Sequence, residues 1–422
     1  MQAAKKDITY KIFLFFLILF LIFYRSPYIF IHGRFVAEEG SVYFANAFKN
    51  NFINTIFFVD YLSGYLNFWA NLSSFFASIT PIEFAPLVTV YLSLIPKLLI
   101  FFFILNKNFF FFTSYLEKLF ACCVVLFSSA MVPEIWANTI NSQVYFAILT
   151  LVIFLIKNQK DDLSVFQLVL ISVSGLTGIY SCAIFPIFFL KFIKFRIKQD
   201  FYNFLILFSL TLIQLLIIFF SKSNGLLYEK KLNFFISYQE IISFYYNIFV
   251  KTFLGRDLAI YLINFFNLST KIYLIFISSI SLFFFYFLFK KKNFLEENNF
   301  RFFIFVLIFQ FLIVSFLVLV GNTSDQVAGR YAAFPSVILL FISIILFKSL
   351  KNKLLKYFFL FVIFLSLLLG FLDYRYKAKY IKLLECINCP SWADEVKKWE
   401  NDNSYNLQIW PYPRKSMILN KI

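Results

Sequence analysis

Apolar runs long enough to cross a lipid bilayer recur along almost the whole chain, and they limit the possible folds more than any other feature. A helix needs about 20 mostly apolar residues to cross roughly 30 Å of hydrocarbon. Hydrophobic residues make up 61% of this 422-residue chain and charged residues 14%, whereas soluble domains carry about 25% charged residues. The sequence therefore predicts an all-α polytopic membrane protein.

Short basic clusters between the apolar runs predict the orientation of the chain, because lysine and arginine are enriched in cytoplasmic loops. The clusters are Lys5, Lys6 and Lys11; Lys191, Lys194, Arg196 and Lys198; residues 290–292; and Lys348, Lys351, Lys353 and Lys356. All lie in the cytoplasm if about eleven helices cross the membrane, with the N-terminus inside and the C-terminal tail outside. The expected helices cover residues 12–30, 84–105, 119–133, 143–157, 164–177, 183–197, 201–220, 271–289, 302–320, 333–348 and 357–372. The basic residues therefore set topology, and the net charge of +17 does not indicate a nucleic-acid partner.

This topology places the longer polar segments on the outer face. Residues 1–372 are expected to form a transmembrane domain with a first outer loop at 31–80 and a further one at 221–270, and residues 373–422 a small outer-face tail. Within the first loop, residues 61–80 are predicted to lie at the membrane interface, and a conventional span is the alternative. The cytoplasmic loops are too short for a nucleotide-binding domain, so any chemistry belongs to the outer face.

The C-terminal tail contains a helix signature. Ser391 is a typical N-cap, and Asp394 follows three residues later, as in a variant of the capping box. Trp392 and Trp399 are seven residues apart, which places them on one helix face that can pack on the membrane domain. The later segment 409–413 is expected to be extended, because proline disfavours helix before it, and to act as a structural lid; substrate contact is its alternative role.

Glu38 and Glu39 are adjacent carboxylates just beyond the first apolar run, in otherwise apolar surroundings. Two neighbouring acids cannot both be buried without a raised pKa or a cation. The arrangement suits a general base or a divalent metal site. Solvated loop acids are the alternative interpretation.

Other polar residues are expected on the same face. Arg330, at the start of a span, is a candidate phosphate ligand, because a guanidinium binds phosphate in a bidentate manner; anchoring a helix end is its alternative role. Arg34 and Tyr65 share the first outer loop with the acids. Lys97 lies within an apolar run, where a charge is usually functional. A further set could bind sugar hydroxyls or join helices through amide hydrogen bonds: Glu134, Trp136, Asn138, Asn141 and Gln143.

These residues resemble the GT-C class of integral membrane glycosyltransferases, and within it an uncharacterised bacterial branch. The likeness rests on an N-terminal span followed by an acidic pair, in the segment 36–44, and on residues 61–66. Similar short elements are residues 134–143, 175–178, 329–331 and 390–392. Each motif is short and of low specificity, although together they are spread along most of the chain. Glu39 stands where that class more usually has an aspartate.

The resemblance implies a polyprenyl-phosphate-linked sugar as donor and transfer on the outer face of a bacterial inner membrane. Glu38 or Glu39 would be the base, and Arg330 with Arg34 would bind the donor phosphate. Glu134, Trp136, Asn138, Asn141 and Tyr65 would contact sugar or acceptor, and a divalent cation held by the acids is a candidate cofactor. The acceptor would be a lipid-linked or surface glycan. A glycan polymerase or ligase and a lipid-linked glycan transporter or flippase are the alternative functions.

Overall fold

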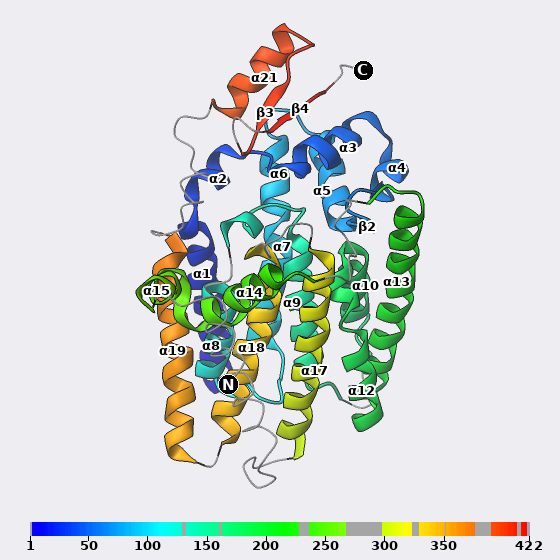
Figure 1. The fold of residues 1–422 in the computed structure, drawn as a ribbon. Helices are drawn as coiled ribbons and strands as arrows, with labels where there is room; N and C mark the ends of the chain where they lie inside the picture. The colour runs from blue at the N-terminus through cyan, green and yellow to red at the C-terminus, as the bar shows by residue number, and fades with distance from the viewer. Residues whose placement is uncertain are drawn as a thin grey trace. The chain divides into compact units, whose positions relative to one another are not determined.

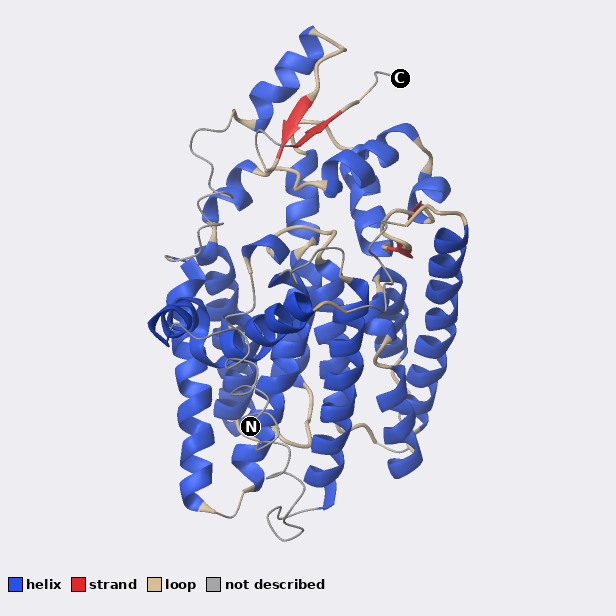
Figure 2. Ribbon diagram, in the orientation of Figure 1, coloured by secondary structure: helices blue, strands red, loops and turns tan. Residues whose placement is uncertain are grey.

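The structure is a computed structural model, and it describes residues 2–128, 132–159, 163–227, 236–266, 298–322, 329–350, 352–375, 390–411 and 415–419. Helices dominate these residues (Figure 2). The described strands form two short antiparallel pairs, in which β1 (Val59–Asp60) pairs with β2 (Tyr65–Leu66) and β3 (Leu407–Ile409) pairs with β4 (Lys415–Met417). The predicted helical class is therefore confirmed.

Five helices in the described part of the chain are long and apolar enough to cross a membrane: Ala85–Asn106, Lys198–Ser223, Asn299–Gly321, Gly329–Lys348 and Lys353–Tyr374. They coincide with five of the expected spans and support a membrane-embedded protein. Eleven spans are not confirmed, because the helices found in four other expected spans have 14 residues or fewer. The expected span at 271–289 lies outside the described residues.

The chain divides into two compact units, which we describe separately. The first comprises Met1–Phe110, Pro133–Tyr228 and Ala378–Ile422. Its helices are α1 (Gln2–Arg25), α2 (Pro27–His32), η1 (Glu39–Phe44), α3 (Ala45–Lys49), α4 (Phe52–Ile56), α5 (Phe68–Ser78), α6 (Ala85–Leu92), α7 (Leu94–Asn106), η2 (Pro133–Ile135), α9 (Ser142–Leu155), α10 (Val165–Thr177), α11 (Ile179–Cys182), α12 (Phe185–Phe195), α13 (Lys198–Ser223) and α21 (Trp392–Asn401).

The centre of the first unit is α9, which is buried on all sides from Val144 to Leu155. A helix that is apolar around its whole circumference has to be covered by neighbours, and α7, α10 and α11 pack against it. The green helices α10 and α12 both pack on α13 (Figure 1). Much of α13 stays exposed, with only 17% of its most apolar stretch buried. This is the pattern of a lipid-facing helix.

Residues 61–80 do not form a membrane-spanning helix. They contain β2 and the 11-residue helix α5. One polar residue that interrupts this apolar run has structural partners: Asn71 Nδ2 donates to the carbonyls of Ile56 and Phe58, at 3.0 and 2.7 Å. These bonds tie α5 to the preceding loop.

The described part of the C-terminal tail belongs to the first unit, where it forms a small cap of α21 and the β3–β4 hairpin (Figure 1). Ser391 accepts a hydrogen bond from the Asp394 N–H, which confirms the predicted N-cap. Trp392 and Trp399 lie in one apolar cluster with Phe35 and Phe44, so the predicted packing face is also confirmed. Trp392 Nε1 donates to the Ile82 carbonyl at 2.8 Å.

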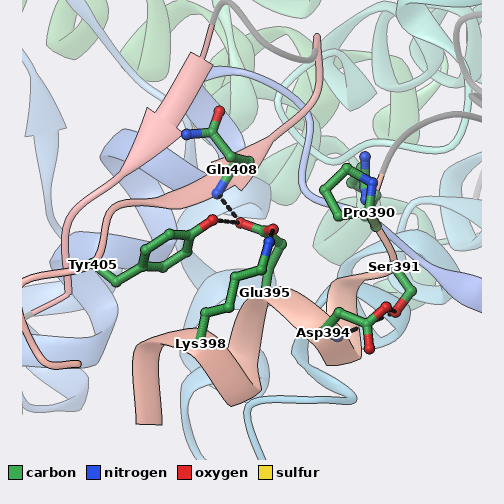
Figure 3. Close-up of polar contacts among 8 residues, drawn as sticks. Pro390, Ser391, Asp394, Glu395, Lys398, Tyr405 and Gln408 are labelled. Carbon is green, nitrogen blue, oxygen red and sulfur yellow. Dashed lines mark hydrogen bonds and ion pairs between the residues drawn. The ribbon is translucent and has the colours of Figure 1, made fainter. Parts of the chain in front are cut away.

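Inside the cap, the buried carboxylate of Glu395 joins the helix to the hairpin. It accepts hydrogen bonds from the Tyr405 hydroxyl and the Gln408 N–H, both at 2.8 Å, and Lys398 Nζ lies 2.9 Å away (Figure 3). Because both carboxylate oxygens have donors, the burial of this acid is compensated.

The second unit comprises Phe111–Val132 and Glu229–Lys377. In it α17 packs on α18, α18 on α19, and α15 on α19. The Thr252 hydroxyl donates to Ser336 at 2.6 Å, and the Ser366 hydroxyl donates to the Thr252 carbonyl. Its helices are α8 (Tyr115–Phe127), α14 (Tyr238–Tyr245), η3 (Tyr246–Val250), α15 (Lys251–Phe266), α17 (Asn298–Gly321), α18 (Gly329–Ser349) and α19 (Lys353–Arg375).

Candidate functional site

The two adjacent acids have different surroundings. The side chain of Glu38 is 41% exposed, and its Oε1 lies 3.3 Å from Lys415 Nζ on the cap. Glu39 is completely buried at the start of η1. The repulsion expected of two neighbouring carboxylates in one site is thus avoided by placing one in solvent and one inside the unit.

Hydrogen bonds with Thr139, Val36 and Thr89 hold Glu39 in place. Its Oε1 accepts from the Thr139 N–H at 2.7 Å and from the Thr139 hydroxyl at 2.6 Å, and its Oε2 accepts from the Val36 N–H at 3.3 Å. Burial raises the pKa of Glu39 to about 7, although the bonds from Thr139 and Val36 act in the opposite direction. A carboxyl group with a pKa near neutrality can both accept and release a proton under physiological conditions.

The backbone on both sides of this contact is strained. Ala37 and Ala137 have φ values of +47° and +52°, a region that costs a non-glycine residue roughly 1–2 kcal/mol. The Ala37 N–H donates to the Trp410 carbonyl at 2.7 Å, and the Trp410 N–H donates to the Phe35 carbonyl at 3.0 Å. The cap therefore holds the strained turn that directs the two acids apart.

Lys97, a buried cation near Glu39, has a second buried cation, Arg25, within electrostatic range. Arg25 ends α1, Lys97 lies on α7, and both are at most 2% exposed. The indole ring of Trp136 is 4.4 Å from Arg25 Cζ and 4.9 Å from Lys97 Nζ, and the ring of Tyr145 is 4.4 Å from Lys97 Nζ. Lys97 interacts electrostatically with both Arg25 and Glu39. Arg25, Glu39, Lys97, Trp136 and Tyr145 form what we call the buried cluster.

A second group of polar residues lies around Tyr43. Burial raises the pKa of the Tyr43 phenol, and the neighbouring charges of Tyr65, Asp60 and Glu38 raise it further. The Tyr65 hydroxyl accepts a hydrogen bond from Gln143 Nε2 at 2.9 Å. Tyr65, a predicted sugar-binding residue, is therefore bonded to the segment 134–143 and lies, like Glu38, within electrostatic range of Tyr43.

The predicted amides shape their own loop. Asn138 Nδ2 donates to the Glu134 carbonyl at 2.7 Å and to the Trp136 carbonyl at 3.1 Å. Asn138 Oδ1 accepts from both the N–H and the Nδ2 of Asn141, each at 3.0 Å. These bonds fit the structural alternative for the amides, since they fold the turn that presents Trp136 to the two cations.

The two arginines predicted to bind phosphate occupy other places. The Arg34 guanidinium donates to the Pro390 carbonyl, which attaches the first loop to the cap. Arg330 lies in the second unit, at the start of α18, with its guanidinium 5.0 Å from the Tyr331 ring. The structure thus brings together Glu39, Trp136, Asn138 and Asn141, and it gives Arg34 a structural contact.

No group of three or more histidine, cysteine, aspartate or glutamate residues is arranged to hold a metal ion in the described ranges. The two acids of the predicted metal site point to Lys415 and to Thr139 respectively. Their carboxylates therefore do not converge on one ion in this arrangement.

Two residues of the site had weak or no sequence signals. Arg25 ends a long apolar run, as basic residues that flank membrane spans commonly do. The residues next to Thr139 give no sign that it contacts an acid. A basic residue at the end of a span, followed within about 15 residues by an acid, is the pattern that would have pointed to Arg25.

No protein-family model, curated protein or solved structure matches this chain.

Proposed function

We propose that the chain is a membrane glycosyltransferase that moves a sugar from a polyprenyl-phosphate donor to a lipid-linked or surface glycan. The observation that carries this proposal is the buried cluster: one carboxylate with a pKa near 7 beside two buried cations, within an apolar helical unit. Such perturbed groups gather at functional sites. Transfer from a phosphate donor needs these two functions, a base for the acceptor and positive charge for the leaving phosphate.

Glu39 is the proposed base. Its Oε1 accepts both bonds from Thr139, and its Oε2 accepts the longer bond from the Val36 N–H, at 3.3 Å. In the reaction the acceptor hydroxyl gives its proton to Oε2 as its oxygen bonds to the anomeric carbon. The bond from that carbon to the phosphate oxygen breaks, and polyprenyl phosphate leaves. Because Glu39 has no exposed surface, acceptor binding has to shift the η1 segment.

Arg25 and Lys97 are the proposed ligands of the leaving phosphate. The two cations repel each other across the same indole ring, and a bound phosphate relieves this repulsion. A low-dielectric site strengthens the attraction for developing negative charge. The reaction would take place on the outer face of a bacterial inner membrane.

Mass spectrometry of surface and lipid-linked glycans tests the proposal. A deletion strain would be complemented with wild type, Glu39→Gln or Glu38→Gln, each checked for expression and thermal stability. We expect wild type to restore a sugar that Glu39→Gln, equally stable, does not. Glu38→Gln is the matched control. If Glu38→Gln abolishes transfer and Glu39→Gln remains active, the base is Glu38. Full activity of both variants would exclude the acid pair and favour the transporter.

A further inference from the structure

An exposed apolar surface surrounds α4 in the first unit. Five large side chains of α4 and the turn that follows are between 42 and 66% exposed: Phe52, Ile53, Phe57, Tyr61 and Leu62. We call them the α4 patch. The backbone beneath is fixed, because Thr55 and Ile56 are buried and Asn71 bonds to the carbonyls of Ile56 and Phe58. Several large apolar side chains exposed on one firmly held segment indicate an interaction site.

The patch continues the lipid-facing surface of α13. The Tyr61 ring lies 5.8 Å from the ring of Phe220, which is three residues from the end of α13. α13 has 26 residues, which corresponds to a length of about 39 Å, longer than the roughly 30 Å of hydrocarbon in a bilayer. The last turn of α13, and Tyr61 with it, therefore falls in the headgroup layer when the helix spans the membrane.

Charged residues flank the patch in the way that membrane interfaces favour. Lys49 precedes α4 and Lys222 follows Phe220 by two residues, and both are exposed. Lysine ammonium groups bind anionic headgroups, while aromatic rings are enriched at the depth between headgroups and hydrocarbon. The charge and the apolar side chains thus match one partner, a lipid surface.

We infer that the α4 patch inserts into the headgroup layer of the membrane and fixes the depth of the first outer loop. The patch is linked to the acids through one ring contact: Phe58 lies 6.1 Å from Tyr43, which belongs to the same η1 segment as Glu39. A loop anchored in this way holds the acid pair at the level of lipid headgroups. The inference does not depend on the reaction proposed above.

Site-directed spin labelling tests this insertion. The full-length chain, with its five cysteines replaced, would carry a nitroxide at position 53 or 57 and be placed in nanodiscs of phosphatidylcholine with a minority of phosphatidylglycerol. Collision rates with oxygen report lipid exposure, and those with a water-soluble nickel complex report aqueous exposure. Leu216, on the exposed face of α13, is the lipid control, and Ile418, on the cap, is the aqueous control.

We expect labels at 53 and 57 to collide with the nickel complex several-fold less often than a label at 418, and with oxygen more often. A label at Asn54, exposed on the same helix, should fall between these two positions and 418. Nickel collision at 53 and 57 equal to that at 418 would overturn the inference. Low collision rates with both reagents would also overturn it, because the patch would then be covered by protein.

Discussion

Two regions of the first unit bury ionisable side chains, and they balance the charge differently. In the first, Lys191 and Asp200 are both completely buried and 3.1 Å apart. Lys191 Nζ also donates to the carbonyls of Phe154 and Ile156, at 2.7 and 2.9 Å. The ammonium thus has three oxygen atoms within 3.1 Å, and the two carbonyls lie at the end of α9, where a helix leaves such groups unsatisfied. The pair therefore has a complete structural role.

The buried cluster is arranged in another way. Lys97 Nζ has the Ser93 carbonyl at 3.3 Å and otherwise faces the rings of Trp136 and Tyr145, while Glu39 is bonded to Thr139 rather than to a cation. Aromatic faces attract cations without neutralising them. The comparison teaches that burial of charge is not by itself a sign of function. A better indication of a functional site is a buried cation that is surrounded by aromatic rings, because these rings do not neutralise it and it can still bind an anion.

The largest effect on stability is expected from Lys191→Met. Removing one member of a buried ion pair leaves the other charge without compensation and costs about 3–5 kcal/mol, and two carbonyls lose their donor as well. Thermal unfolding in detergent should show a strongly lowered midpoint. The double variant Lys191→Met with Asp200→Asn is the control, and it should recover part of the loss. An unchanged unfolding midpoint in the single variant would contradict the structural role of the Lys191–Asp200 pair.

Lys97→Met should behave in the opposite way. Methionine keeps most of the side-chain volume, and the substitution removes the repulsion between Lys97 and Arg25, so we expect a change in unfolding free energy within about 1 kcal/mol. Sugar transfer should fall by about 10²–10³-fold, the usual effect of removing one group that stabilises the leaving oxyanion. The glycan assay and the unfolding midpoint are measured on the same preparation. If Lys97→Met lowers the unfolding midpoint as much as Lys191→Met does, the role of the buried cluster is structural and the proposed contrast is wrong.

The pH dependence of stability sharpens the description of Glu39. Its pKa is about 7 in the folded chain against an ordinary value of 4.5, so between these values the folded state keeps a proton that the unfolded state loses. Stability from this group is complete below pH 4.5 and is lost as the pH rises to about 7. The change is on the order of 3 kcal/mol. Glu39→Gln should lack this dependence, and a parallel pH profile in both proteins would contradict the buried position.

The general class of the fold could be predicted from the sequence, because long apolar runs admit few structures in a bilayer. The predicted span at 201–220 coincides with α13, and the predicted helix in the tail begins at Ser391 as expected. The number of spans could not be predicted equally well. Run length alone does not separate the fully buried, 14-residue α9 from a lipid-crossing helix, since both are apolar around their whole circumference.

The site was only half visible in the sequence. Glu38 and Glu39 stand out as charges among apolar residues, but identical side chains at adjacent positions give no sign that one is buried and the other exposed. The positive φ of Ala37 separates them. Alanine has no preference for this left-handed conformation, so the sequence does not predict it. Thr139 is 100 residues from its partner Glu39, so only the folded chain brings them together.

The smallest effect is expected from Lys415→Ala. The pair of Lys415 with Glu38 is 3.3 Å long, with both side chains more than 40% exposed, and exposed ion pairs of this kind contribute about 0.2–1 kcal/mol. The cap keeps its backbone bonds between Trp410 and the residues 35 and 37, so the unfolding midpoint should shift little and sugar transfer should continue. Thr139→Val is the contrasting change, because it removes the 2.6 Å bond to the buried Glu39. Equal and small effects of the two variants would mean that Glu39 is held no more firmly than Glu38, and the contrast between the acids would then be one of solvent exposure alone.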